Sequence, residues 1–106
     1  MKTVFLDPVR VDLQNFRRYV INKFGGTAWA ATRDKIADTI AEIEAAPRNG
    51  STPPELADFR MSGYYEVLSG TNRIIYKVDG DIIYVHLVVD TRSDLEDILA
   101  RRLFRM

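Results

Sequence analysis

Side chains that could contact a phosphate or transfer a proton gather in the second half of the chain. Cations and aromatic rings follow one another there at Arg60, Tyr64, Arg73, Lys77, Tyr84 and Arg92. Cations interleaved with aromatic rings can hold a nucleic-acid strand, because the cations contact phosphates and the rings stack on bases. The alternative is a solvated sheet face with cross-strand ion pairs, such as Glu66 with Arg73 or Lys77. The nearby Glu55 and Glu66 and the balanced composition favour this alternative.

His86 is the chain's one histidine and lies in a β-prone stretch. The register predicted below places it opposite Arg73. A histidine beside a cation can serve as a general acid or base. A lone histidine within a strand more often has a structural role, and both alternatives stay open at this point.

Residues 72–89 must position these side chains. Their sequence predicts two strands joined by a tight turn. Asp79-Gly80 between β-branched and aromatic residues predicts a type I′ hairpin loop. This register pairs Tyr76 with Ile83 and Ile74 with Val85. One face is then the core, with Ile74, Tyr76, Val78, Ile83, Val85, Leu87 and Val89, and the other face is mixed, with Arg73, Ile75, Lys77, Ile82, Tyr84 and His86. A third strand over 64–68 turns back at Gly70-Thr71 and places Leu68 opposite Arg73.

The flanking segments predict one more strand and three helices. Residues 2–6 are β-prone, and Asp7 as N-cap followed by Pro8 opens a helix that stops at Gly25-Gly26. An apolar stripe follows that helix, through Val9, Leu13, Phe16, Val20 and Phe24. A second helix over 27–46 completes an antiparallel helical hairpin. A third helix over 93–105 begins with a capping box formed by Ser93 and Glu96.

We therefore expect an α+β fold of order β-α-α-β-β-β-α. It is a single domain over residues 1–106, with two layers: an antiparallel-rich sheet packed against a helical hairpin. A C-terminal helix follows.

Composition limits the chemistry further. The 106 residues carry 15 basic and 15 acidic side chains, one histidine and no cysteine. A thiolate site, a histidine-rich metal site and a clustered carboxylate metal site are excluded, so we expect no metal and no cofactor. No apolar run is long enough for a membrane span, and the N-terminus does not resemble a signal peptide. We expect a cytoplasmic protein with no membrane partner.

The order and spacing of several short segments resemble the RelE/ParE superfamily of type II toxin–antitoxin toxins. The segments are the Asp-Pro helix ending at Phe24-Gly25, residues 46–50 (Ala-Pro-Arg-Asn-Gly), residues 54–56 (Pro-Glu-Leu), residues 72–78 (Asn-Arg-Ile-Ile-Tyr-Lys-Val) with their Asp-Gly turn, and residues 88–94 (Val-Val-Asp-Thr-Arg-Ser-Asp). The resemblance covers nearly the full length. It implies a toxin that inhibits growth and that a cognate antitoxin protein neutralises.

One branch of the superfamily cleaves messenger RNA in the ribosome. One of its residue patterns uses a Glu, an Arg and a late His with Tyr, and Glu55 and Arg73 stand in the first two positions. The late positions fall at Thr91 and Arg92, and His86 comes about five residues too early. The acid–base set is therefore incomplete, although Glu55, Arg73 and Arg92 would be the site if the chain were a ribonuclease. The branch's other pattern, a cluster of lysines and arginines, is not matched, because no lysine lies between Lys35 and Lys77.

The ParE-like branch, whose members poison DNA gyrase, is more similar to this chain. Its final Arg-x-Asp segment is matched by Arg92-Ser93-Asp94, while Asp90 replaces a frequent histidine. The resemblance implies a gyrase-poisoning toxin that is not an enzyme; the alternatives are a ribosome-dependent ribonuclease and a non-toxic binding module of the same fold. Candidate residues for contacting the target or the antitoxin are Arg60, Arg73, Lys77, Arg92, Arg101, Arg102 and Arg105.

Overall fold

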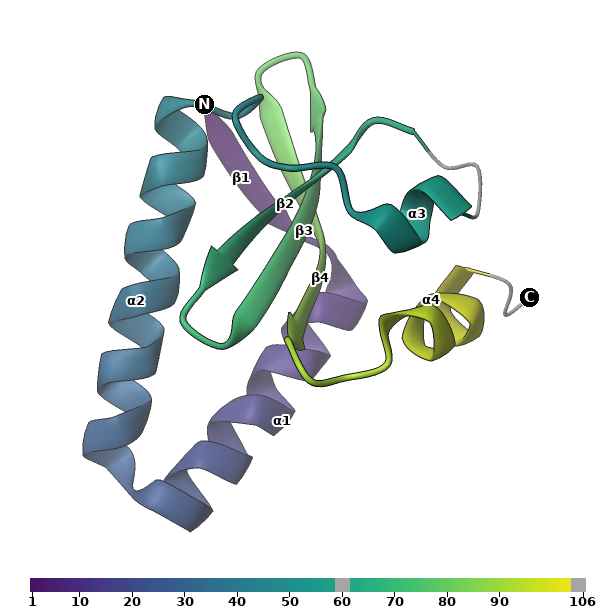
Figure 1. The fold of residues 1–106 in the computed structure, drawn as a ribbon. Coiled ribbons are helices and arrows are strands. Elements are labelled where there is room, and N and C mark those ends of the chain that lie inside the picture. The colour runs from purple at the N-terminus through teal and green to yellow at the C-terminus, as the bar shows by residue number, and fades with distance from the viewer. Residues whose placement is uncertain (59–61, 104–106) are drawn as a thin grey trace.

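A computed structural model describes residues 1–58 and 62–103 of the chain (Figure 1). Its elements, in chain order, are β1 (Lys2–Phe5), α1 (Asp7–Phe24), α2 (Gly26–Ala45), α3 (Pro54–Asp58), β2 (Tyr64–Ser69), β3 (Asn72–Asp79), β4 (Ile82–Asp90) and α4 (Leu95–Leu103). The predicted order of strands and longer helices is confirmed. The short helix α3 lies between the helical hairpin and the strand meander.

The strands form one sheet in the order β1-β4-β3-β2. β1 runs parallel to β4, whereas β3 pairs antiparallel with both β4 and β2. The hairpin of β3 and β4 is therefore the centre of the sheet, with β1 paired to β4 on one side and β2 paired to β3 on the other.

The predicted pairing of β2 with β3 is confirmed. Leu68 lies opposite Arg73 and Val67 lies opposite Ile74. Gly70 has a φ of 61° in the connecting turn, a conformation that glycine adopts without steric cost. The turn chemistry alone was thus enough to fix this register.

The predicted pairing of β3 with β4 is wrong in two respects. Asp79 pairs with Ile82, so the loop residues are Gly80 and Asp81 rather than Asp79 and Gly80. Gly80 supplies the positive φ, 58°, at the first loop position, and the strands gain one further residue pair. This loop shift and the bulge at His86 together place Arg73 opposite Val89 and not opposite His86.

A β-bulge at His86 is the second departure. Tyr76 pairs with Val85 but Ile75 pairs with Leu87, which leaves His86 as the extra residue on β4. An extra residue shifts the alternation of faces by one position. Leu87 therefore joins the face opposite to the one predicted.

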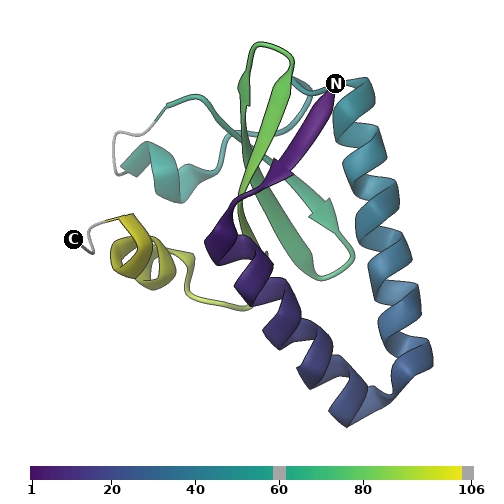
Figure 2. The same ribbon diagram turned by 180° about the vertical axis from the view of Figure 1, so that it is seen from behind.

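The sheet carries a buried apolar cluster on each face. The hairpin cluster joins α1 and α2 to the sheet through Val9, Ile36, Ile43, Ile74, Tyr76, Ile83, Val85 and Val88. The outer cluster joins α3 and α4 to the other face through Leu56, Tyr64, Ile75, Leu87, Leu95 and Leu99. Figures 1 and 2 show α2 on one side of the sheet and α3 and α4 on the other. The expected two layers are thus three, because the predicted mixed face is covered.

Two predicted helix starts also differ from the structure. Leu6, rather than Asp7, is the N-cap of α1, and Asp7 is its first helical residue. At α4 the Asp94 carboxylate accepts a hydrogen bond of 3.1 Å from the Asp97 backbone N–H, so Asp94 caps the helix in place of Ser93. An aspartate is as good an N-cap as a serine, and both candidates stand side by side in the sequence.

Candidate functional site

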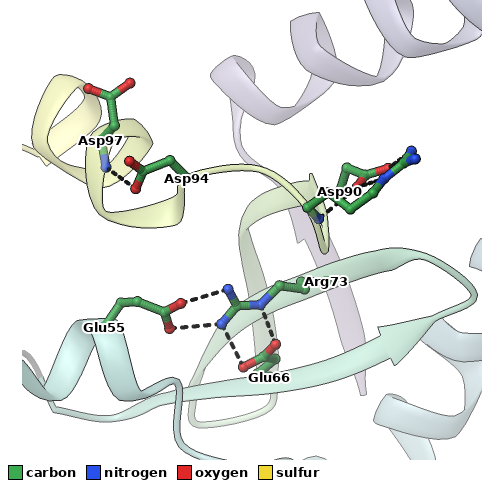
Figure 3. Close-up of polar contacts among 7 residues, drawn as sticks. Glu55, Glu66, Arg73, Asp90, Asp94 and Asp97 are labelled. Carbon is green, nitrogen blue, oxygen red and sulfur yellow. Dashed lines mark hydrogen bonds and ion pairs between the residues drawn. The ribbon is translucent and has the colours of Figure 1, made fainter.

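Arg73 stands at the centre of a three-residue ion-pair cluster that joins three elements. Its Nη1 donates to Glu55 Oε2 at 2.8 Å and its Nη2 donates to Glu55 Oε1 at 2.9 Å, a bidentate contact with α3. Its Nε and Nη2 also donate to the two carboxylate oxygens of Glu66 on β2, the second at 3.0 Å. Figure 3 shows the guanidinium lying between the two carboxylates. All the nitrogens of the Arg73 fork are therefore used within the protein.

The cluster is largely shielded from solvent. Exposed fractions are 12% for the Arg73 side chain, 22% for Glu55 and 13% for Glu66. Hydrogen bonds from Arg73 hold the pKa of Glu55 below its ordinary value, against the opposing effect of burial. The paired carboxylates raise the pKa of Arg73, with Glu55 the larger cause. Two carboxylates around one guanidinium leave a net charge of −1, which disfavours a phosphate at this position.

Arg92 lies apart from this cluster. Its side chain is 85% exposed and pairs locally with Asp90, Nε to Oδ1 at 3.0 Å and Nη2 to Oδ2 at 3.0 Å. The hydrogen bonds from Arg92 lower the pKa of Asp90. The structure thus brings Glu55 and Arg73 together but does not add Arg92 to them.

Lys77 and His86 both face Tyr64. The Lys77 Nζ lies 4.8 Å from the Tyr64 ring centroid, and the His86 ring contacts the same tyrosine edge to face at 5.1 Å. Burial, and secondarily the charge of Lys77, lower the pKa of His86. Both effects favour the neutral form of His86, whose ring packs against Tyr64.

Arg101 and Arg102 border a groove of about 650 Å³ between the start of α1, the end of β4 and α4. Arg101 pairs with Asp97 one helical turn earlier, at 3.0 Å. Arg102 pairs with Asp12 of α1 and also donates to the His86 carbonyl oxygen at 3.5 Å, which ties α4 to the body of the protein. The remaining candidates, Arg60 and Arg105, lie outside the described residues.

One exposed cluster was not singled out from the sequence. Tyr19, Lys23 and Phe24 lie together at the C-terminal end of α1, with the two rings edge to face at 6.4 Å. Their spacing of four and five residues on one predicted helix is the signal that could have found them. Phe24 was instead assigned to the buried stripe, yet it is 63% exposed.

The described part of the chain, residues 1–58 and 62–103, offers neither a metal site nor a membrane-spanning helix. No group of three or more histidine or acidic side chains there is arranged to hold a metal ion. None of the helices described there is long and apolar enough to cross a membrane.

The element order, the sheet order β1-β4-β3-β2 and the helical hairpin on one face are the architecture of the RelE/ParE superfamily of type II toxins. Residues 4–95 match the family model described as the ParE toxin of the type II toxin–antitoxin system parDE, and the chain belongs to this family. It is therefore a ParE-like toxin of a type II toxin–antitoxin system, as the resemblance predicted. Comparison with individual curated proteins finds no match.

Proposed function

We propose that this toxin inhibits growth by poisoning DNA gyrase and that a cognate antitoxin neutralises it. The observation that carries the proposal is the state of Arg73, whose whole fork is bound by Glu55 and Glu66. A ribonuclease needs a cation directed at the phosphate and a group that moves protons near it. Arg73 is not directed at solvent, and His86 is packed against Tyr64.

The alternative, a ribosome-dependent messenger RNA endoribonuclease, draws its support from one contact. Glu55 and Arg73 stand in the positions of a nuclease Glu and Arg, and they are hydrogen-bonded to each other. In that mechanism the ribosome would have to displace both Glu55 and Glu66 from Arg73 to free its guanidinium. The third option is a non-toxic binding module with the same fold.

Assays with purified components separate these possibilities. Wild-type toxin added to purified gyrase and supercoiled DNA should trap cleaved DNA bound to the enzyme, while messenger RNA on ribosomes stays intact. The double variant Glu55→Gln with Arg73→Met, checked for folding by thermal unfolding, should still trap it, since both side chains bond within the cluster and are largely shielded from solvent. Codon-specific cleavage of ribosome-bound messenger RNA, lost in the double variant, would establish the alternative. A toxin inert in both assays would establish the third.

The edge strand β2 offers the antitoxin a place to bind. Ser51 forms an isolated antiparallel bridge with Glu66 through two backbone hydrogen bonds, of 3.0 and 2.7 Å. The backbone groups of Leu68, two residues on, point to the same side, and the Leu68 side chain is 60% exposed. An extended antitoxin segment can continue the edge from there by strand addition. Such a segment would order only on binding, as disordered partners do.

A further inference from the structure

We propose that the tip of the helical hairpin is the surface that grips the target protein, and that it fits an acidic protein surface with an apolar recess. The hairpin tip is defined as Arg17, Arg18, Tyr19, Lys23 and Phe24, on the last two turns of α1. The inference rests on the proposed function, since the target meant is gyrase.

The aromatic residues of the hairpin tip are exposed in a way that folding does not explain. Tyr19 is 52% exposed and Phe24 is 63% exposed, and their rings contact each other edge to face at 6.4 Å. The Lys23 Nζ lies 5.4 Å from the Tyr19 ring centroid and 5.7 Å from that of Phe24, and it donates to the Tyr19 hydroxyl at 3.1 Å. An ordered pair of aromatic rings beside cations is the composition of a protein-binding hot spot.

The stretch of sequence that carries these rings has charges of one sign. Between Asp12 and Asp34 the sequence carries four cations, Arg17, Arg18, Lys23 and Arg33, and no acidic residue. Among the described residues, no carboxylate pairs with Arg17, Arg18 or Lys23. This is a strong local asymmetry in a chain whose formal net charge is zero. An acidic partner is drawn to such a region during encounter, and a basic one is repelled.

The hairpin tip also projects from the body of the protein. Figures 1 and 2 show the end of α1 and the start of α2 extending beyond the strands of the sheet. Below the tip, the rings of Phe16 on α1 and Trp29 on α2 pack edge to face at 5.9 Å and brace the two helices. A braced projection can enter a recess of a large partner, whereas an extended antitoxin segment can add to the β2 edge.

A protein partner fits the hairpin tip better than a nucleic acid does. Stacking on bases needs open ring faces, and Lys23 occupies one face of both Tyr19 and Phe24. The chain also lacks the basic excess usual in nucleic-acid-binding domains, with a pI of about 6.6. An acidic recess lined by apolar side chains would accept the two ring edges and pair with Arg17 and Arg18.

Two variants of the full-length toxin test the inference. In Y19S/F24S both exposed rings are removed, and in R17E/R18E two unpaired cations are reversed. A matched control is K2E/R48E, which makes the same charge change at two exposed positions near the opposite end of α2. Binding to purified gyrase and to the cognate antitoxin is measured for each protein, with thermal unfolding as the check on folding.

Y19S/F24S should weaken gyrase binding by about 30-fold or more, the effect of losing a hot spot. R17E/R18E should slow association with gyrase by about 10-fold and abolish its dependence on salt. Antitoxin binding should be unchanged in both variants, and the control should match the wild type throughout. Since the two variants change different groups, R17E/R18E decides the matter if Y19S/F24S does not fold.

Several results would overturn the inference. Gyrase binding at the wild-type level in the variants would do so and leave the proposed function standing. Loss of antitoxin binding with gyrase binding intact would assign the hairpin tip to the antitoxin. If the same variants weaken binding to DNA alone as much as they weaken binding to gyrase, the hairpin tip is a nucleic-acid-binding surface. A wild-type toxin without effect on gyrase would refute the proposed function and this assignment together.

Discussion

Replacing Arg73 by methionine should destabilise the protein far more than removing any exposed cation. The substitution keeps most of the side-chain volume but leaves Glu55 and Glu66 without their shared partner. Both carboxylates are mostly shielded from water, with exposed fractions of 22% and 13%. Two neighbouring negative charges in that position repel each other and are poorly solvated.

The size of the effect follows from the burial. Removing one partner of a fully buried ion pair costs about 3–5 kcal/mol of unfolding free energy. Residual solvent contact at the two carboxylates reduces this to about 2–4 kcal/mol. In a domain of this size the melting temperature should fall by on the order of 10 °C.

The loss should depend on pH with a defined sign. Hydrogen bonding from Arg73 lowers the pKa of Glu55 below its ordinary value of 4.5. The stability that Glu55 contributes is thus complete above about pH 4.5 and disappears as the pH falls through the lower native pKa. The gap between wild type and R73M should be widest near neutral pH and should narrow in acid.

Urea unfolding at neutral pH and in mild acid measures both quantities. The matched control is K77M, which removes a cation on the same strand. Its Nζ lies 4.8 Å from the Tyr64 ring centroid and is in no ion pair among the described residues, so its loss should cost about 0.5–1 kcal/mol. The reasoning is refuted if R73M costs no more than K77M, or if the gap to wild type stays constant as the pH falls.

Two further outcomes concern the surroundings of this cluster. An added Cβ at Gly50 would lie 2.8 Å from the Tyr76 hydroxyl and 3.1 Å from the Glu66 carbonyl oxygen. Gly50→Ala should therefore lower the free energy of unfolding by about 1–3 kcal/mol. An unchanged thermal melting curve would contradict this. Burial and the charge of Lys77 lower the pKa of His86 below its ordinary value of 6.5. The stability that neutral His86 contributes is therefore complete above about pH 6.5 and is lost as the pH falls through the lower native pKa. His86→Gln should flatten the pH dependence of stability in that range, and K77M should raise the pKa of His86 in an NMR titration; an unmoved titration would contradict the assigned cause.

Local signals in the sequence were sufficient for most of the elements. Gly25 ends α1 where the glycine pair predicted, and the turn at Gly70 fixed the pairing of β2 with β3. The pairing of β3 with β4 failed first at the loop, which is Gly80-Asp81 rather than Asp79-Gly80, and again at His86, because nothing local marks the bulge there. A bulge adds no turn residue and interrupts no apolar run, so only the packing of both sheet faces determines it.

The candidate site was predictable where partners share a sheet and not where they come from distant elements. Glu66 was named as a partner of Arg73 because neighbouring strands place them side by side. The contact of Arg102 with Asp12 joins residues 90 positions apart and depends on how α4 lies against α1. No periodicity or spacing in the sequence encodes that geometry.

The central sheet separates two apolar clusters, one packed against the helical hairpin and the other packed against α3 and α4. Ile74 faces the helical hairpin while its neighbour Ile75 faces α3 and α4, so adjacent residues of β3 belong to different clusters. Substitutions beneath α3 and α4 can therefore accumulate without repacking the helical hairpin.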